Sequence, residues 1–547
     1  MLWAIERARS WLLVELVLLG LSSAVFSQEI LWIRQFGTDG DDYAHGVAVD
    51  EGGNVYVVGA IRGTLPGQTS AGNRDAFVRK YDSAGNEIWT RQFGSSVMDY
   101  AHGVAVDGAG NVYVVGWTEG TLPEQTSAGY EDVFVRKYDN LGNEIWTRQF
   151  GSVWDYPYGF PSELAYSVAL DGAGNVYIVG FTGGVLPGQT KVGYVDAFVR
   201  KYDSAGNEIW TRQFGSAIRD YACGVAVDGA GNVYVVGWTW GVLPGQTSVG
   251  DWDAFVRKYD SAGNEIWTRQ FGSTSRDFAC GVAVDGTDNV YVVGYTYGPL
   301  AGQNDAFVYK YDSAGNEIWT RRLGQAFDID QAFDNRADSV AVDNRGNVYI
   351  TGYVGGDFFV CKYDSAGTQI WTYQFGPGSA QGVAVDEAGN VYIVGYTWEA
   401  LPGQTNAGGR DVFVAKLGPG PSPPKPGQIT GQVTDASTGR VISGVRVEAS
   451  GPTTASTTTD ANGNYTLSLP PGTYELSASA PGYQSQRKSG ITVTADQTVQ
   501  VDFSLVKLPA PAAPTNLSPA NGAKDVHLFP RLEASPPLQD VDKDSIP

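Results

Sequence analysis

The sequence predicts an all-β protein whose main part is a seven-bladed β-propeller. Runs of Val, Ile and Tyr alternate with Gly, Asp and Asn clusters, and the 547 residues include 71 glycines, 30 tyrosines and 15 tryptophans. Such a composition is typical of short strands joined by tight turns. A tryptophan-bearing phrase also recurs at spacings of 57, 57, 64, 57, 52 and 52 residues. A fixed period of this length indicates a repeat architecture.

Three phrases recur seven times each. The phrase E-I-W-T-R-Q-F-G and its weaker copies carry a tryptophan at Trp32, Trp89, Trp146, Trp210, Trp267, Trp319 and Trp371. The phrase V-A-V-D-x-x-x-N-V-Y carries an asparagine at Asn54, Asn111, Asn175, Asn232, Asn289, Asn347 and Asn390. The phrase D-A-F-V-R-K-Y-D begins, with substitutions, at Asp75, Asp132, Asp196, Asp253, Asp305, Asp357 and Asp411. Each unit therefore holds four short apolar runs, which predicts four strands.

The lengths of the connections set the order of strands within a blade. Val47–Asp50 and Asn54–Gly59 are separated by a hairpin-length turn that contains glycine, and Phe77–Asp82 and Glu87–Phe93 by a similar turn. A longer loop joins the two pairs. The predicted blade therefore runs from V-A-V-D on the inside to E-I-W-T-R-Q-F on the outside.

The first strand of the chain is predicted to close the ring. Seven inner strands can be counted, but the last unit ends at Leu417 without an outer strand, and the missing strand stands at the other end of the chain, as Ile30–Phe36. Sharing one blade between the two ends closes a propeller and protects its sheet edges. A linear solenoid is the alternative, but it does not explain a chain that starts one strand out of phase.

The segment G-V-A-V-D-G-A-G-N-V-Y-V-V-G-W-T, Gly103–Thr118, resembles the bacterial β-propeller repeat of the SBBP family. The resemblance covers about residues 29–417. It implies the propeller architecture and an exported or surface location. Because members of this family are mostly without an assigned activity, it implies little about biochemical function.

The two ends of the chain predict an exported protein with further modules. Residues 1–27 have the order of a signal peptide, with Arg7 and Arg9 before an apolar stretch. No later segment is a candidate membrane span, and the formal net charge of −22 argues against nucleic-acid partners. We therefore expect a secreted or cell-surface protein with a propeller over residues 28–418.

A proline-rich linker, residues 419–427, leads into a predicted small β-sandwich over residues 428–506. There, apolar residues alternate between turn signals such as D-A-N-G and P-P-G. The order of these segments resembles the carboxypeptidase regulatory-like, transthyretin-type domain, which implies a spacer or adhesion module. Residues 507–547 resemble the start of an immunoglobulin-like or fibronectin-like module, and we expect that module to be truncated.

No catalytic motif stands out. The chain has three histidines and lacks G-x-S-x-G, H-E-x-x-H and phosphate-binding glycine patterns. Asp50/Asn54 and Asp82/Asn86 recur from blade to blade, as turn-capping residues do. We expect no cofactor. Calcium is an ion that the sequence suggests, because Asp540, Asp542 and Asp544 resemble the start of a calcium loop.

One position of the inner strand is a candidate metal site. The residue before the Gly or Val that opens this strand is His45, His102, Ser167, Cys223, Cys280, Ser339 and Gln381 in the seven units. Two imidazoles and two thiols, His45, His102, Cys223 and Cys280, are ligands that zinc or copper prefers. The alternative is that these residues only line the channel, whose width would keep them apart. A Cys223–Cys280 disulfide requires Cα atoms within about 7 Å.

The long loops carry the predicted ligand-binding residues, because they vary where the rest of the unit repeats. Aromatic rings beside amide and carboxylate groups suit sugar rings. The candidates are Trp117, Trp154, Tyr156, Tyr158, Trp240, Trp252 and Trp398. The alternative, that such rings pack between strands, applies most to Trp117 and Trp238, which directly follow a strand glycine.

Three functional classes stay open. The first is a non-catalytic binding or scaffold protein whose long-loop face holds a carbohydrate or protein ligand. The second is an extracellular propeller enzyme, a polysaccharide lyase or hydrolase, which would need two converging carboxylates, one of them with a raised pKa. The third is a purely structural protein of the cell envelope.

Overall fold

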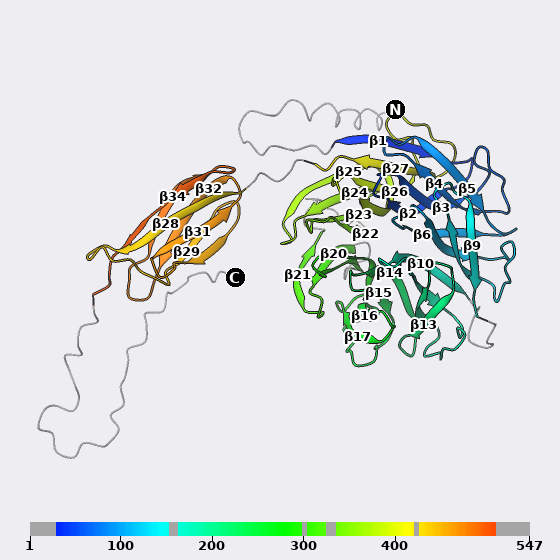
Figure 1. Cartoon of the computed structure of the whole chain (residues 1–547), viewed down its shortest axis with the longest axis horizontal. Helices are drawn as coiled ribbons and strands as arrows, with labels where there is room; N and C mark the ends of the chain where they lie inside the picture. The colour runs from blue at the N-terminus through cyan, green and yellow to red at the C-terminus, as the bar shows by residue number, and fades with distance from the viewer. Residues whose placement is uncertain (1–28, 153–161, 298–303, 324–334, 421–425, 510–547) are drawn as a thin grey trace, which may run out of the picture. The chain divides into compact units, whose positions relative to one another are not determined.

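The computed structural model describes residues 29–152, 162–297, 304–323, 335–420 and 426–509 (Figure 1). These residues form strands and turns, and none of them is helical. The chain divides between Pro421 and Ser422 into two compact units. The predicted signal peptide, 1–27, and the predicted calcium-loop residues Asp540, Asp542 and Asp544 lie outside the described residues.

The first unit is built from repeated antiparallel four-stranded sheets in which neighbours in sequence are neighbours in space. Their inner strands are β2 (Tyr43–Val49), β6 (Asp99–Val106), β10 (Glu163–Leu170), β14 (Asp220–Val227), β18 (Asp277–Val284) and β22 (Asn335–Val342). The second strands are β3 (Val55–Ile61), β7 (Val112–Thr118), β11 (Val176–Thr182), β15 (Val233–Thr239), β19 (Val290–Tyr297), β23 (Val348–Val354) and β26 (Val391–Thr397).

The third strands are β4 (Asp75–Tyr81), β8 (Asp132–Tyr138), β12 (Asp196–Tyr202), β16 (Asp253–Tyr259), β20 (Asn304–Tyr311), β24 (Asp357–Tyr363) and β27 (Asp411–Leu417). The outer strands are β5 (Glu87–Phe93), β9 (Glu144–Phe150), β13 (Glu208–Phe214), β17 (Glu265–Phe271) and β21 (Glu317–Arg322).

Two strands depart from this pattern. The long strand β25 (Gln369–Val385) pairs with β24 through its first half and with β26 through its second, so it serves two sheets. The first strand, β1 (Ile30–Phe36), pairs antiparallel with β27 and lies beside it in Figure 1. The sheet that results has the order β1-β27-β26-β25-β24-β23-β22.

The core lies between neighbouring sheets. All seven residues of β3 and of β4 are buried, which explains why β3 is apolar without alternation. The buried charged residues of β4 are hydrogen-bonded: Arg79 to Thr90, Lys80 to Asn140 and Asp75 to Gln92. Side chains of β3 and β4 share one apolar cluster with residues of β6, β7 and β8. Gly59 in β3 is a point of close approach, because a Cβ there would lie 1.9 Å from the Tyr43 carbonyl oxygen. The repeated sheets therefore stack face to face.

The recurring aspartates cap turns, as predicted. In the β2–β3 turn the Asp50 carboxylate accepts hydrogen bonds from the Asn54 backbone and side chain and from the Tyr56 hydroxyl. In the β4–β5 turn the Asp82 carboxylate accepts from the Ala84 and Asn86 amides. Each aspartate thus satisfies the amides of its own hairpin, which is a structural role.

The outer strand latches onto the next sheet. The Trp89 Nε1–H donates to the Asn140 carbonyl at 3.1 Å, and the Arg91 Nε–H donates to the Gly142 carbonyl at 2.7 Å. The first strand makes the same pair of contacts, since Trp32 donates to the Ser83 carbonyl and Arg34 to the Gly85 carbonyl. The recurring W-x-R spacing is therefore an inter-sheet contact.

The second unit is a two-sheet sandwich. One sheet holds β28 (Gly427–Asp435), β31 (Asn464–Leu469), β34 (Thr498–Gln500) and β35 (Phe503–Leu505). The other sheet holds β29 (Arg446–Ser450), β30 (Ala455–Thr458), β32 (Gly472–Ser479) and β33 (Gln486–Val493). Val433, Leu467 and Leu476 belong to the single apolar cluster between them.

In the part of the chain that the structure describes, no helix has the length and apolar character needed to cross a membrane. The all-β architecture of repeated four-stranded sheets fits the predicted β-propeller.

Candidate functional site

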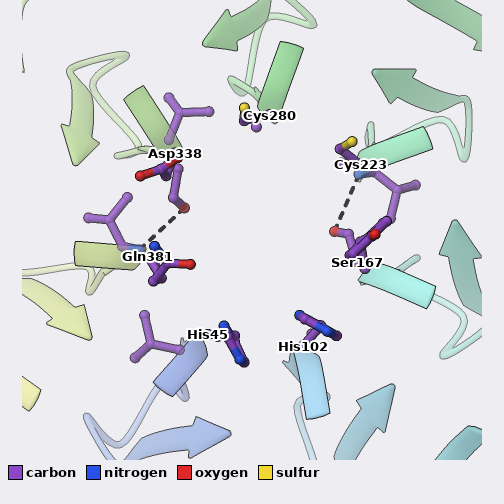
Figure 2. Close-up of a pocket in the computed structure, with 18 of the residues that line it drawn as sticks. His45, His102, Ser167, Cys223, Cys280, Asp338 and Gln381 are labelled. Atoms are coloured by element: carbon purple, nitrogen blue, oxygen red, sulfur yellow. Dashed lines mark hydrogen bonds between the residues drawn. The ribbon is translucent and has the colours of Figure 1, made fainter. Parts of the chain in front are cut away.

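A central cavity of about 260 Å³ is surrounded by the inner strands (Figure 2). One side chain from each of seven strands, β25 included, stands at a β-bulge in its strand and lines this cavity. These bulge residues are His45, His102, Tyr166, Cys223, Cys280, Asp338 and Gln381.

The bulge corrects the predicted ring of residues at two positions. Ala165 pairs with Gly180 and Ser167 with Val179, so the extra residue is Tyr166 and not Ser167. In β22 the extra residue is likewise Asp338 and not Ser339. Both serines line the cavity, but neither is the bulge residue, because serine replaces the glycine that marks the register in the other strands. A bulge adds one residue to one strand, so it breaks simple alternation.

Ser167 and Ser339 instead join neighbouring inner strands. The Ser167 hydroxyl accepts a hydrogen bond from the Val225 amide, and the Ser339 hydroxyl accepts one from the Val383 amide, both at 3.3 Å. At the equivalent place in β2, a Cβ on Gly46 would lie 2.6 Å from the His102 carbonyl oxygen. Only glycine or serine stands at this position because the adjacent backbone is so close.

The two histidines pack against each other, with ring centroids 4.5 Å apart. The Trp117 Nε1–H donates to His102 Nε2 at 3.1 Å, so the His102 ring is neutral. Burial lowers the pKa of His45 to about 4, and burial together with the neighbouring His45 lowers the pKa of His102 well below its usual value. Both rings are therefore uncharged at neutral pH.

The two cysteines lie across the cavity from the histidines, as Figure 2 shows. Both thiols are free, so they form no disulfide in this structure. Burial raises the pKa of Cys223 to about 12 and raises that of Cys280 well above its usual value, which keeps both as protonated thiols. Within the described residues, no group of three or more His, Cys, Asp or Glu has the spacing of a metal site.

The long loops gather at one end of the strands. Consecutive strands alternate in direction, so the β2–β3 and β4–β5 turns share one end of a sheet and the longer connections share the other. A glutamine of the outer strand holds these loops: Gln92 Oε1 accepts from the Leu65 amide, and its side-chain amide donates to Asp75. In the last unit, Gln35 of β1 does the same for Leu401 and Asp411. We call the end that carries these loops the long-loop face.

A stack of rings occupies this face at β14–β18. Tyr221 and Trp238 lie 3.9 Å apart, Trp238 and Trp252 lie 4.5 Å apart and nearly parallel, and the Arg276 guanidinium lies 5.0 Å from the Trp252 ring centre. Trp238 and Trp252 are therefore packed between partners. Trp240, which lies 5.8 Å from Trp252, keeps 40% of its surface exposed.

The other predicted ligand-binding residues are scattered. Trp117 is half-buried and stacks on Tyr100 of the neighbouring strand at 4.5 Å. Trp398 is 42% exposed and lies 6.2 Å from Tyr396. Trp154, Tyr156 and Tyr158 lie outside the described residues. The structure thus brings Trp240 and Trp252 together. Trp117 and Trp398 pack instead against Tyr100 and Tyr396.

Two arginines of this face, Arg74 and Arg410, were not among the predicted site residues. Arg74 lies over both Tyr43 and Tyr100 and donates to the Tyr100 hydroxyl at 2.9 Å. Arg410 lies over Tyr43 and Tyr396 and donates to the Tyr43 hydroxyl. A comparison of the repeats could have found them, since Arg74 and Arg410 both stand at the variable position directly before the third strand.

Family models match both units. A β-propeller repeat model of the SBBP family matches residues 31–63, 88–122, 209–244, 266–301 and 370–401, and a carboxypeptidase regulatory-like domain model matches residues 428–506.

Two curated proteins are similar in sequence. An uncharacterized WD repeat-containing protein, L264, of Acanthamoeba polyphaga mimivirus is 23% identical over 425 residues, which are 59% of this chain and 30% of that protein. The regulatory protein FlaEY of Caulobacter vibrioides is 28% identical over 172 residues, 30% of this chain and 18% of that protein. The matches span less than a third of the length of either relative.

Among solved structures, the WD40 β-propeller domain of Doa1 is 11% identical, with a TM-score of 0.41, over 72% of this chain and 97% of that one. The polysaccharide lyase Uly1 is 11% identical, with a TM-score of 0.42, over 73% and 91%. By its family matches, the chain carries SBBP β-propeller repeats followed by a carboxypeptidase regulatory-like domain.

Proposed function

We propose that the repeated sheets are the seven blades of a closed propeller, with β1 as the outer strand of the last blade. Three contacts support this. β1 pairs with β27, Gln35 anchors the loop of the last unit as Gln92 anchors that of the first, and a Cβ on Gly382 of β25 would lie 3.0 Å from the His45 carbonyl oxygen of β2. The last contact makes the final inner strand a neighbour of the first.

We further propose that this protein is exported and acts as a non-catalytic binding or scaffold protein, whose long-loop face holds a carbohydrate ligand. The observation that carries the proposal is Trp240, a large ring 40% exposed beside the half-buried stack of Trp238 and Trp252. Its amide donates to the Arg219 carbonyl at 2.8 Å, so the loop is fixed by backbone hydrogen bonding. A rigid, exposed ring on a loop suits ligand recognition.

The sandwich would then be a spacer between the propeller and a surface or a larger assembly. Export rests on the signal-like residues 1–27. Fractionation of cells that express the full chain tests it, since retention of the protein in the cytosol with residues 1–27 uncleaved would exclude export.

The binding test is a polysaccharide screen on the full chain with a Trp240→Ala variant. We expect the variant to lose about tenfold or more in affinity, because an exposed anchor ring carries a large share of binding energy. Ile266→Ala is the matched control. Ile266 lies in β17 of the same sheet, is 51% exposed, and stands beside the short β16–β17 turn, at the other end of the strands from the long loops. Equal binding by wild type and Trp240→Ala would refute the proposal. Release of products from a polysaccharide would favour the lyase or hydrolase class, and absence of any ligand would favour a structural envelope protein.

A further inference from the structure

The long-loop face holds one arginine that differs from its neighbours. Four arginines stack on aromatic rings there, and three of them are engaged: Arg74 and Arg410 donate to tyrosine hydroxyls, and Arg336 pairs with Asp338 at 3.1 Å. Arg276 is exposed and lies over Trp252. Within the described residues, its guanidinium makes no ion pair or side-chain hydrogen bond.

The position of Arg276 is fixed although its donors are unused. The Asp277 amide donates to the Trp252 carbonyl at 2.8 Å, and the Tyr297 amide donates to the Arg276 carbonyl at 2.9 Å. The guanidinium lies over Trp252, which stacks on Trp238, and this contact restricts the movement of the group. An exposed guanidinium is planar and is suited to bind a carboxylate through two parallel hydrogen bonds.

Two exposed rings, Trp240 and Tyr297, lie in the same aromatic cluster as Trp252. Trp240 lies 5.8 Å from Trp252, and Phe278 lies 5.4 Å from Trp252 and 5.6 Å from Tyr297. Trp240 and Tyr297 are 40% and 43% exposed. The loop amides of both rings are hydrogen-bonded to the carbonyls of Arg219 and Arg276. The surface around Trp252 therefore carries two exposed aromatic rings and one cation.

We infer that Trp240, Arg276 and Tyr297 form a binding site for a uronic-acid polysaccharide. This inference rests on the proposed carbohydrate-binding function and names its ligand class. The two rings stack on sugar faces, and the Arg276 guanidinium pairs with the carboxylate of a sugar between them. The charge complementarity is local: the Arg276 guanidinium is a cation for the sugar carboxylate, while the formal net charge of −22 on the whole chain opposes polyanions at long range.

The test measures binding of the full chain to polygalacturonate, to neutral dextran and to dextran sulfate. We expect Arg276→Gln to weaken polygalacturonate binding about tenfold and Arg276→Lys to weaken it less, because lysine keeps the charge and loses the planar fork. Arg345→Gln is the charge-matched control: Arg345 is exposed in the β22–β23 turn, at the other end of the strands. It should stay within about twofold of wild type, since it removes the same charge at a distance.

The outcomes separate the inference from the function on which it rests. Polygalacturonate binding by Arg276→Gln at wild-type strength, or binding of dextran sulfate but not of polygalacturonate, would overturn the uronate site. If Trp240→Ala still lost dextran binding in that case, the carbohydrate-binding function would stand alone. Absence of binding to all three polymers and in the wider screen would overturn both. Melting temperatures of the variants exclude misfolding as the cause.

Discussion

At the scale of residues, the chemistry of the central cavity is decided by one bulge position in each inner strand. Substitution at this position between repeats changes the lining from histidine to tyrosine, cysteine, aspartate or glutamine without a change in the strand. The local motif V-A-V-D predicts the strand but not the bulge. Tyr166 and Asp338 were therefore missed, because the pairing partner that defines a bulge lies on another strand.

His45 makes this position sensitive to acid. Its pKa in the folded protein is about 4, below the ordinary value of 6.5, because the ring is buried. The unfolded chain therefore binds more protons between these values, so stability is present above pH 6.5 and is lost as the pH falls toward 4. The His45→Gln substitution places at this position the residue found in the last unit, Gln381. As the pH falls from 6.5 to 4, we expect the melting temperature of the His45→Gln variant to fall less than that of the wild type. Parallel melting curves against pH for the two proteins would contradict this.

Gly85 carries a second prediction at this scale. Its φ is +79°, and a Cβ there would lie 2.7 Å from the Trp32 ring of β1. Gly67 is the matched control, with a φ of +73° and open space around it. Gly67→Ala should cost about 1–2 kcal/mol of the free energy of unfolding from the backbone alone. Gly85→Ala should cost more, because it also displaces β1, and equal losses in denaturant titrations would show that the Trp32 contact is unimportant.

At the scale of elements, the outer strand is the connector between sheets. Trp89 and Arg91 bond to carbonyls of the next β8–β9 turn, and Trp32 and Arg34 repeat these bonds from β1 to the β4–β5 turn. The sequence predicted the strand and its phase. The hydrogen bonds between sheets could not be predicted, because their acceptors are backbone carbonyls, which every residue has, and only packing decides which of them is reached.

Removal of β1 tests the role of that strand. A chain that starts at residue 37 exposes the edge of β27 and loses the hydrogen bonds from Trp32 to the Ser83 carbonyl and from Arg34 to the Gly85 carbonyl. We expect the melting temperature of the first unit to fall by at least about 5 °C, given the usual relation between lost free energy and melting temperature. Calorimetry measures this temperature. A truncated chain that melts at the temperature of the full chain would mean that β1 does not close the ring.

At the scale of the whole molecule, a closed ring and a linear solenoid differ in how they tolerate the loss of a repeat. In a solenoid each unit contacts only its neighbours, so stability is roughly a sum over units. In a ring every unit has two neighbours, and the angle between sheets is matched to their number. The close approach of β25 to β2 is the contact that distinguishes the two arrangements.

Deletion of residues 94–150 removes β6 to β9 and joins equivalent positions of the repeat. A ring should then fail to close and should lose its cooperative unfolding transition, since six sheets cannot keep the angles of seven. A solenoid should keep a transition at only slightly lower temperature. Calorimetry together with near-ultraviolet circular dichroism decides between them, and a native-like, cooperative deletion variant would refute the ring.

The sequence by itself determined the strands, the turn caps and the order of the four strands in a unit. These features depend on neighbours in the chain: Asp50 caps a turn that ends at Asn54, and the apolar run of β3 is buried where the units pack. Only the tertiary structure decided which side chains reach the cavity and which rings stay accessible. Trp240 and Trp252 are both tryptophans of the long β15–β16 loop and look alike in the sequence. In the structure Trp252 packs against Trp238 and Arg276, while Trp240 is exposed. The physical reason is that bulges and ring stacks depend on partners far away in sequence.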